Sequence, residues 1–118
     1  MAGYRQDRVS EDIKREIIAV IRELKDPRVK DKMLTVVRVD VSHDLSFAKV
    51  YISALDGIDS AKEAVKGLVS ATGRIRHEVG ARLRLRKTPE MKFVADDSVE
   101  HGMELFKKIE DLTRDKDE

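Results

Sequence analysis

The chain has 118 residues, 40% of them charged, and a formal net charge of only +1. It has no cysteine, which excludes disulfides, thiol catalysis and cysteine-ligated zinc, and its 4% aromatic content excludes a sheet that stacks RNA bases on several neighbouring rings. No apolar run approaches the ~20 residues of a membrane span and the N-terminus shows no signal-peptide core, so we expect a soluble cytosolic protein.

The N-terminal part predicts a flexible arm over residues 1–9 and a helix over about 10–25. Val9 and Ser10 fit a hydrophobic staple and an N-cap, and apolar residues then recur at helical spacing. Pro27 marks the end of this helix, because the residue before a proline avoids the helical region.

Two alternating segments, 34–42 and 46–55, predict an antiparallel hairpin joined by a short polar turn. In the first segment we expect Val37, Val39 and Val41 on one face. In the second segment the expected face comprises Ala48, Val50, Ile52 and Ala54. The small alanines suggest that a helix packs closely on it.

A second helical pattern begins at Ile58 and is interrupted at Gly73. Glycine inside a helix costs about 1 kcal/mol relative to alanine, so we expect a bend or the close approach of another backbone there. The apolar stripe of Ile75, Val79 and Leu83 continues the helix, which gives way to extended chain before Pro89.

The C-terminal part predicts a short strand over 91–94 and a last amphipathic helix, with a charged tail over 114–118. The apolar stripe of this helix comprises Val99, Met103, Phe106, Ile109 and Leu112. Residues 10–113 then form a single α+β domain, in which helices cover a small three-stranded sheet.

Positive charge concentrates in residues 71–92, which carry seven basic and two acidic residues, whereas 93–118 carry four basic and nine acidic. Six of these cations fall within 14 residues, where only Glu78 opposes them: Arg74, Arg76, Arg82, Arg84, Arg86 and Lys87. The planar guanidinium of arginine suits bidentate phosphate contact, so this basic cluster predicts a nucleic-acid surface. The alternative is a solvated surface paired with carboxylates from elsewhere in the chain.

Two neighbouring segments each have two interpretations. The small residues of 70–73 could expose free backbone N–H groups that attract anions, or could serve only to bend the helix. Segment 25–29 could place Arg28 beside the basic cluster, or could only end the preceding helix.

Catalytic and metal-binding signatures are missing from the sequence. Its three histidines lack metal-ligand spacing, its serines lack nucleophile-elbow glycines, and it has no phosphate-binding glycine loop. Asp96 and Asp97 near His101 fit helix capping better than an acid–base cluster. We therefore predict no enzyme activity, no cofactor and no metal.

Four motifs together resemble the bacterial ribosome-binding factor A family. They are KDPRV at 25–29, VRVDVSHDLSFAKVYIS at 37–53, ATGRIRHEVGARLRLRKTPEMKF at 71–93 and DDSVEHGMEL at 96–105. Each motif alone is weak, but their order is specific and extends over about residues 5–106.

The resemblance implies a type II KH-like fold with an interhelical kink at Ala71, Thr72 and Gly73. It implies a non-catalytic assembly factor that binds 16S rRNA in the free 30S subunit and assists late maturation, including processing of the 16S rRNA 5′ end, with a link to growth in the cold. We expect a monomer that contacts RNA through the basic cluster, with Arg5, Arg8 and Arg28 extending the footprint.

Arg74 and the pair Lys87-Thr88 depart from the family pattern, which often has aromatic or apolar residues there. These departures favour phosphate contact over base stacking. Two rival functions stay open: a KH-like RNA-binding module of another RNA-associated complex, and a protein–protein adaptor that uses the acidic final helix. Sedimentation with small subunits tests the first, and truncation after Ala95 tests the second.

Overall fold

The computed structural model describes residues 2–97, 107, 109 and 110. Its elements along the chain are α1 (Ala2–Glu23), α2 (Pro27–Lys30), β1 (Leu34–Val41), β2 (Phe47–Ala54), α3 (Ile58–Ser70), α4 (Thr72–Leu83) and β3 (Glu90–Ala95). The expected final helix lies almost entirely outside the described residues.

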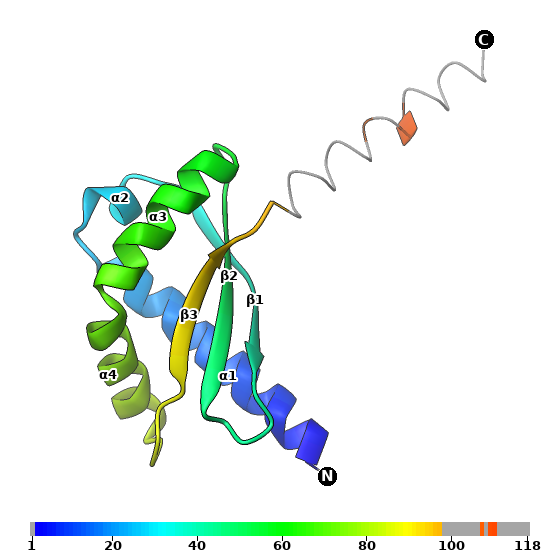
Figure 1. The fold of residues 1–118 in the computed structure, drawn as a ribbon, viewed down its shortest axis with the longest axis vertical. Coiled ribbons are helices and arrows are strands. Elements are labelled where there is room, and N and C mark those ends of the chain that lie inside the picture. The colour runs from blue at the N-terminus through cyan, green and yellow to red at the C-terminus, as the bar shows by residue number, and fades with distance from the viewer. Residues whose placement is uncertain (1, 98–106, 108, 111–118) are drawn as a thin grey trace.

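The three strands form one sheet in the order β1-β2-β3 (Figure 1). Strands β1 and β2 are antiparallel, as the predicted hairpin requires, whereas β2 and β3 are parallel. Parallel neighbours need a crossover connection, and α3 and α4 provide it. The predicted α+β class, with a three-stranded sheet and a broken helix pair, is confirmed.

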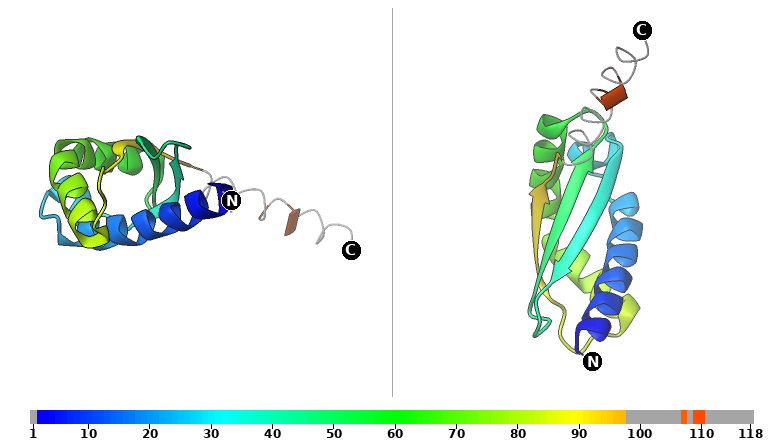
Figure 2. Two further views of the ribbon diagram at one scale, coloured as in Figure 1. Left: turned by 90° about the horizontal axis from the view of Figure 1, so that it is seen from below. Right: turned by 90° about the vertical axis from the view of Figure 1, so that its right-hand side faces the viewer.

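The core lies between the sheet and the helices on one of its faces. Helix α1 packs on β1 and α4, while α3 packs on β2 and β3 (Figure 2). The predicted inner face of β2 is confirmed, since Ala48, Val50 and Ile52 are fully buried. Burial of this continuous apolar cluster is the main stabilising contribution to the fold.

The inner face of β1 differs from the predicted one. Val36, Val39 and Val41 are buried, and Val37 is not, because the pairing with β2 shifts between Val36 and Arg38. Such a bulge places two residues opposite one and reverses the facing of those before it. The prediction that Val37 shares a face with Val39 and Val41 was therefore wrong.

Helix α1 begins at Ala2, well before the expected start near residue 10. Residues 2–9 contain no proline, so nothing in this stretch stops the helix from extending towards the N-terminus. The end of the helix is closer to the prediction: α1 stops at Glu23, and Pro27 opens the one-turn helix α2.

Candidate nucleic-acid interface

The kink between α3 and α4 falls at Ala71, two residues before the glycine that suggested it. The backbone N–H of Ala71 still donates to the carbonyl oxygens of Gly67 and Leu68, at 3.2 and 3.1 Å. The Thr72 hydroxyl donates to the Val69 carbonyl oxygen at 2.8 Å. These bonds satisfy carbonyl groups at the end of α3 and fix the direction in which α4 leaves.

Gly73 lies in the first turn of α4, and a Cβ added there would meet no atom within 4 Å among the described residues. Of the two alternatives expected at Gly73, the structure has the bend, at Ala71, and not the close approach of another backbone. Close approaches occur instead at Gly67, against Val29, and at Gly80, against Thr88.

We expect Gly73→Ala to raise the free energy of unfolding by up to about 1 kcal/mol, because alanine favours the helix and no neighbour obstructs it. Denaturant unfolding measures this change. If the same variant also loses affinity for RNA, the glycine serves RNA contact and not the fold. A loss of stability would contradict the open surroundings of Gly73.

Two contacts position the loop that follows α4. The Arg76 guanidinium donates to the carbonyl oxygens of Thr88 and Pro89, at 3.1 and 3.2 Å. A Cβ at Gly80 would lie 2.3 Å from the Thr88 hydroxyl, so the glycine lets the loop return against α4. Arg76 thus holds the loop, and its guanidinium is partly used inside the molecule.

Arg82 is surrounded by carboxylates from two helices. Its guanidinium donates to Glu23 of α1 at 3.0 Å, and lies 3.7 Å from Glu16 of α1 and 3.5 Å from Glu78 of α4. The hydrogen bond to Glu23 is the main reason that the pKa of Arg82 is raised. Arg82 therefore ties α4 to α1, and its charge is balanced within the molecule.

Arg84 ends α4 in the left-handed conformation, with φ of 53°. Glycine is the usual residue at this position, because a side chain there costs roughly 1–2 kcal/mol. An arginine at a strained, exposed helix end points to a role for its side chain.

We expect Arg84→Gly to stabilise the fold by about 1 kcal/mol, through relief of this strain, and to weaken RNA binding. Thermal unfolding and a binding titration on the same preparation measure the two effects. A variant that is less stable than the parent would show that Arg84 supports the fold.

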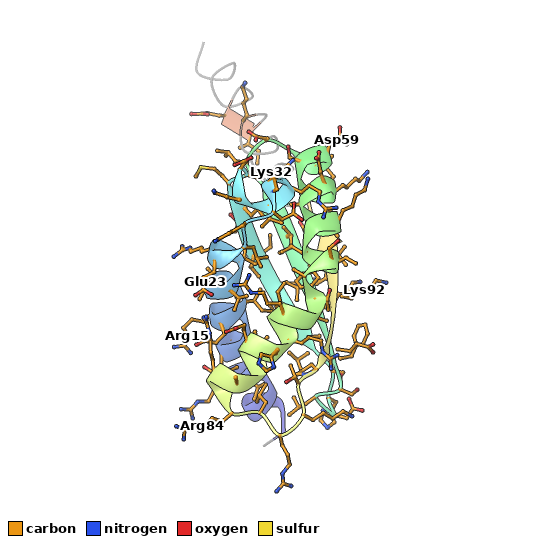
Figure 3. All side chains as sticks on the ribbon, turned by 90° about the vertical axis from the view of Figure 1, so that its left-hand side faces the viewer. Arg15, Glu23, Lys32, Asp59, Arg84 and Lys92 are labelled. Carbon is orange, nitrogen blue, oxygen red and sulfur yellow. The ribbon has the colours of Figure 1, made fainter. Side chains whose placement is uncertain are left out.

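Four cations of the basic cluster are exposed and have no ion-pair partner in the part of the chain that the structure describes: Arg74, Arg84, Arg86 and Lys87. We call these four the free cations. Arg84 lies at the end of the molecule opposite Lys32 and Asp59 (Figure 3). Arg8 is exposed on α1, the helix against which α4 packs, and Arg5 lies nearer the start of the same helix.

Arg82 and Arg84 provide a matched pair of neighbouring arginines. We expect Arg82→Gln to lower the unfolding temperature and to leave the salt dependence of RNA binding unchanged, because its charge is already balanced. We expect Arg84→Gln to leave stability unchanged and to reduce the log–log salt slope by about 0.7–0.9, the loss of one phosphate contact. If Arg82→Gln reduced the salt slope and Arg84→Gln lowered the unfolding temperature, the roles assigned to these two arginines would be excluded.

Arg28 lies beside Ser70, the last residue of α3 before the kink. Its guanidinium is 3.4 Å from the Ser70 hydroxyl, and it also pairs with Asp26 at 2.7 Å. Asp26 caps α2 by accepting from the Arg28 backbone N–H, and the side-chain hydrogen bond from Arg28 is the main reason that the pKa of Asp26 is lowered. The segment follows the end of α1 and places a partly neutralised cation beside the end of α3, and the extension of the basic cluster by Arg28 stays a prediction.

Sequence reasoning missed Glu16 and Glu23 as partners of Arg82. They lie on the first helix, far from Arg82 along the chain, and their spacing on α1 resembles that of ordinary solvent-facing residues. Within the described residues, no cluster of His, Cys, Asp and Glu could hold a metal ion, and no helix is long and apolar enough to cross a membrane.

Comparison with known proteins places this chain in one family. The sequence pattern of ribosome-binding factor A matches residues 5–109. A ribosome-binding factor A of Clostridium tetani is 43% identical over 118 residues, which cover 99% of this chain and 97% of that protein. The chain belongs to the ribosome-binding factor A family.

Solved structures of ribosome-binding factor A share the fold. The crystal structure of the Thermus thermophilus protein has a TM-score of 0.67 and 29% identity, covering 76% of this chain and 93% of that one. A homology model of the Thermus thermophilus protein, fitted into a cryo-EM map of its complex with 30S, has a TM-score of 0.60 and 30% identity, covering 73% of this chain and 89% of that one. The family resemblance of the four motifs is thus confirmed.

Proposed function

We propose that the chain binds the free 30S subunit through 16S rRNA and assists late small-subunit maturation, including processing of the 16S rRNA 5′ end. It acts in the cytoplasm, as a monomer and without a catalytic step of its own, and its loss matters most in the cold. The observation that carries the proposal is membership of the ribosome-binding factor A family, together with the fit of a Thermus relative into a 30S complex.

The free cations support contact with rRNA. They project from α4 and the loop that Arg76 holds, so their side chains start from a fixed backbone. Together with Arg8 they offer five phosphate contacts, which predicts a log–log salt slope of about −3.5 to −4.5. Recognition is of backbone and shape, since base edges lie deep in the narrow groove of an RNA helix.

Assistance in maturation requires a difference in affinity. A protein that binds one conformation of the precursor subunit more tightly than competing conformations raises the population of that conformation, whereas equal affinity shifts nothing. The proposed role therefore predicts tighter binding to precursor subunits than to mature ones.

Sedimentation of a cell extract through a sucrose gradient tests the proposal. We expect the chain to run with free small subunits and not with complete ribosomes, and cells without it to accumulate 16S rRNA with an unprocessed 5′ end. Association with another RNA in place of the small subunit would support the alternative, a KH-like module of a different complex, and would exclude the proposal.

A further inference from the structure

A groove of about 350 Å³ lies between α1 and β1, the edge strand farthest from β3. Two cations line it, Lys14 and Arg22, together with the apolar side chains of Ile18, Ile21 and Leu34. The lining contains no carboxylate, although carboxylates make up nearly half of the charged residues of the chain. The groove therefore combines a positive rim with an apolar floor.

The three α1 residues at its centre form one stripe. Lys14, Ile18 and Arg22 are spaced four residues apart, so they lie on the same side of the helix. At 1.5 Å per residue the two cations are about 12 Å apart along the axis, with the half-buried Ile18 midway between them. Neither cation has an ion-pair partner within residues 8–97.

The other wall of the groove is an edge strand. Among the described strands, β1 pairs only with β2, so alternate residues of β1 direct their backbone N–H and C=O groups away from the sheet. Leu34, Thr35 and Val36 line the groove, and the bulge that follows Val36 ends this regular stretch. The groove thus offers main-chain hydrogen bonds over a short length.

We propose that this groove binds an extended segment of a partner protein that carries an acidic, an apolar and a second acidic residue at alternate positions. An extended chain rises about 3.3 Å per residue, and alternate side chains point to one side. Carboxylates four residues apart are then about 13 Å apart, which matches the separation of Lys14 and Arg22, and the apolar residue between them meets Ile18. The segment adds to β1 as a short strand.

The apolar floor favours a peptide over RNA as the occupant. A nucleic-acid strand that reached both cations would place phosphate or ribose over Ile18 and Leu34, which offer no hydrogen bond and would desolvate the phosphate. No aromatic ring lines the groove for a base to stack on. The inference is independent of the proposed function, which rests on α4 and the loop after it.

Titration of the full chain with the end-blocked peptide SETITES, followed by amide NMR, tests the proposal. We expect peptide-dependent shifts at Leu34, Thr35 and Val36, and at least about tenfold weaker binding of the control peptides SKTITKS and SETSTES. Lys14→Glu with Arg22→Glu should weaken binding at least about tenfold, whereas Lys62→Glu with Lys66→Glu, the same charge change on α3, should not.

Several results would overturn the proposal. The proposal fails if millimolar SETITES causes no shifts at Leu34, Thr35 and Val36, or if SKTITKS binds equally well. It also fails if oligouridylate, and not SETITES, shifts these amides. Concentration-dependent shifts of the chain alone would assign the groove to self-association and would equally exclude it. Binding of the variant with Lys14→Glu and Arg22→Glu to small subunits is measured as well. It tests the proposed function, which rests on α4 and the loop after it, and so separates a failure of the peptide proposal from a failure of that function.

Discussion

Replacing Arg84, Arg86 and Lys87 together with glutamate is expected to weaken binding to free small subunits about a thousand-fold. A hydrogen bond to a charged group contributes about 1.5–3 kcal/mol, and 1.4 kcal/mol corresponds to a tenfold change in affinity. Each of the three side chains is exposed, and none has an ion-pair partner in the described part of the chain. Their loss therefore costs binding without cost to the fold.

The salt dependence separates lost contacts from altered folding. Sedimentation of the variant with free small subunits at several salt concentrations should show a slope reduced by about 2.1–2.7, the value for three phosphates. A control variant with Lys25, Lys30 and Lys62 replaced by glutamate has the same net charge but changes α2 and the regions beside it. If both variants lose affinity equally, net charge and not the free cations governs binding.

Gly67→Val is expected to destabilise the protein by about 2–3 kcal/mol and to lower its unfolding temperature by roughly 10 °C. A Cβ at Gly67 would lie 2.7 Å from Cγ2 of Val29, whose side chain is only 2% exposed, and 3.3 Å from Cβ of Arg28. Valine has a stiff side chain, so Val29 has little room to turn away. The overlap would force α2 away from α3.

Two further variants make the test specific. Gly73→Val introduces the same residue into the neighbouring helix, where no atom lies within 4 Å of the new Cβ, and should destabilise far less. Val29→Ala in the Gly67→Val background removes the atom that overlaps and should restore part of the stability, as a coupled pair does. Equal losses for the two valine variants would refute the close packing of α2 on α3.

Several elements of the fold follow from local patterns of residues. The alternation of Ala48, Val50 and Ile52 predicted the inner face of β2, since a strand that packs on one side needs apolar residues at every second position. The stripe of Ile75 and Val79 predicted the buried side of α4, which the structure confirms. Both patterns lie within a single element, so they do not depend on what packs beside it.

Two mistaken expectations concern features that depend on pairing or on the rest of the chain. Val37 leaves the inner face because of the register between β1 and β2, which no residue of β1 specifies alone. The early start of α1 reflects the absence of a stop signal before Ser10, and an N-cap residue does not by itself end a helix that can continue.

In the basic cluster, too, a local pattern predicted part of the result and tertiary contacts decided the rest. Its composition predicted phosphate contact, but the sequence alone did not show which of the six cations have partners within the fold. The structure distinguishes them: Arg82 faces three carboxylates, Arg76 holds the loop at Thr88 and Pro89, and the free cations remain available. The residues that balance Arg82 come largely from α1, so only the packing of α1 on α4 could reveal them.

The sequence by itself determined the class of the fold, the family and the location of positive charge, because hydrophobic periodicity, motif order and charge density are properties of the chain. Only the tertiary structure decided which cations are neutralised, which glycines are needed for close packing, and where a cationic groove opens beside β1. The physical reason is distance: ion pairs and steric contacts act over a few ångströms, and folding alone brings together the residues that make them.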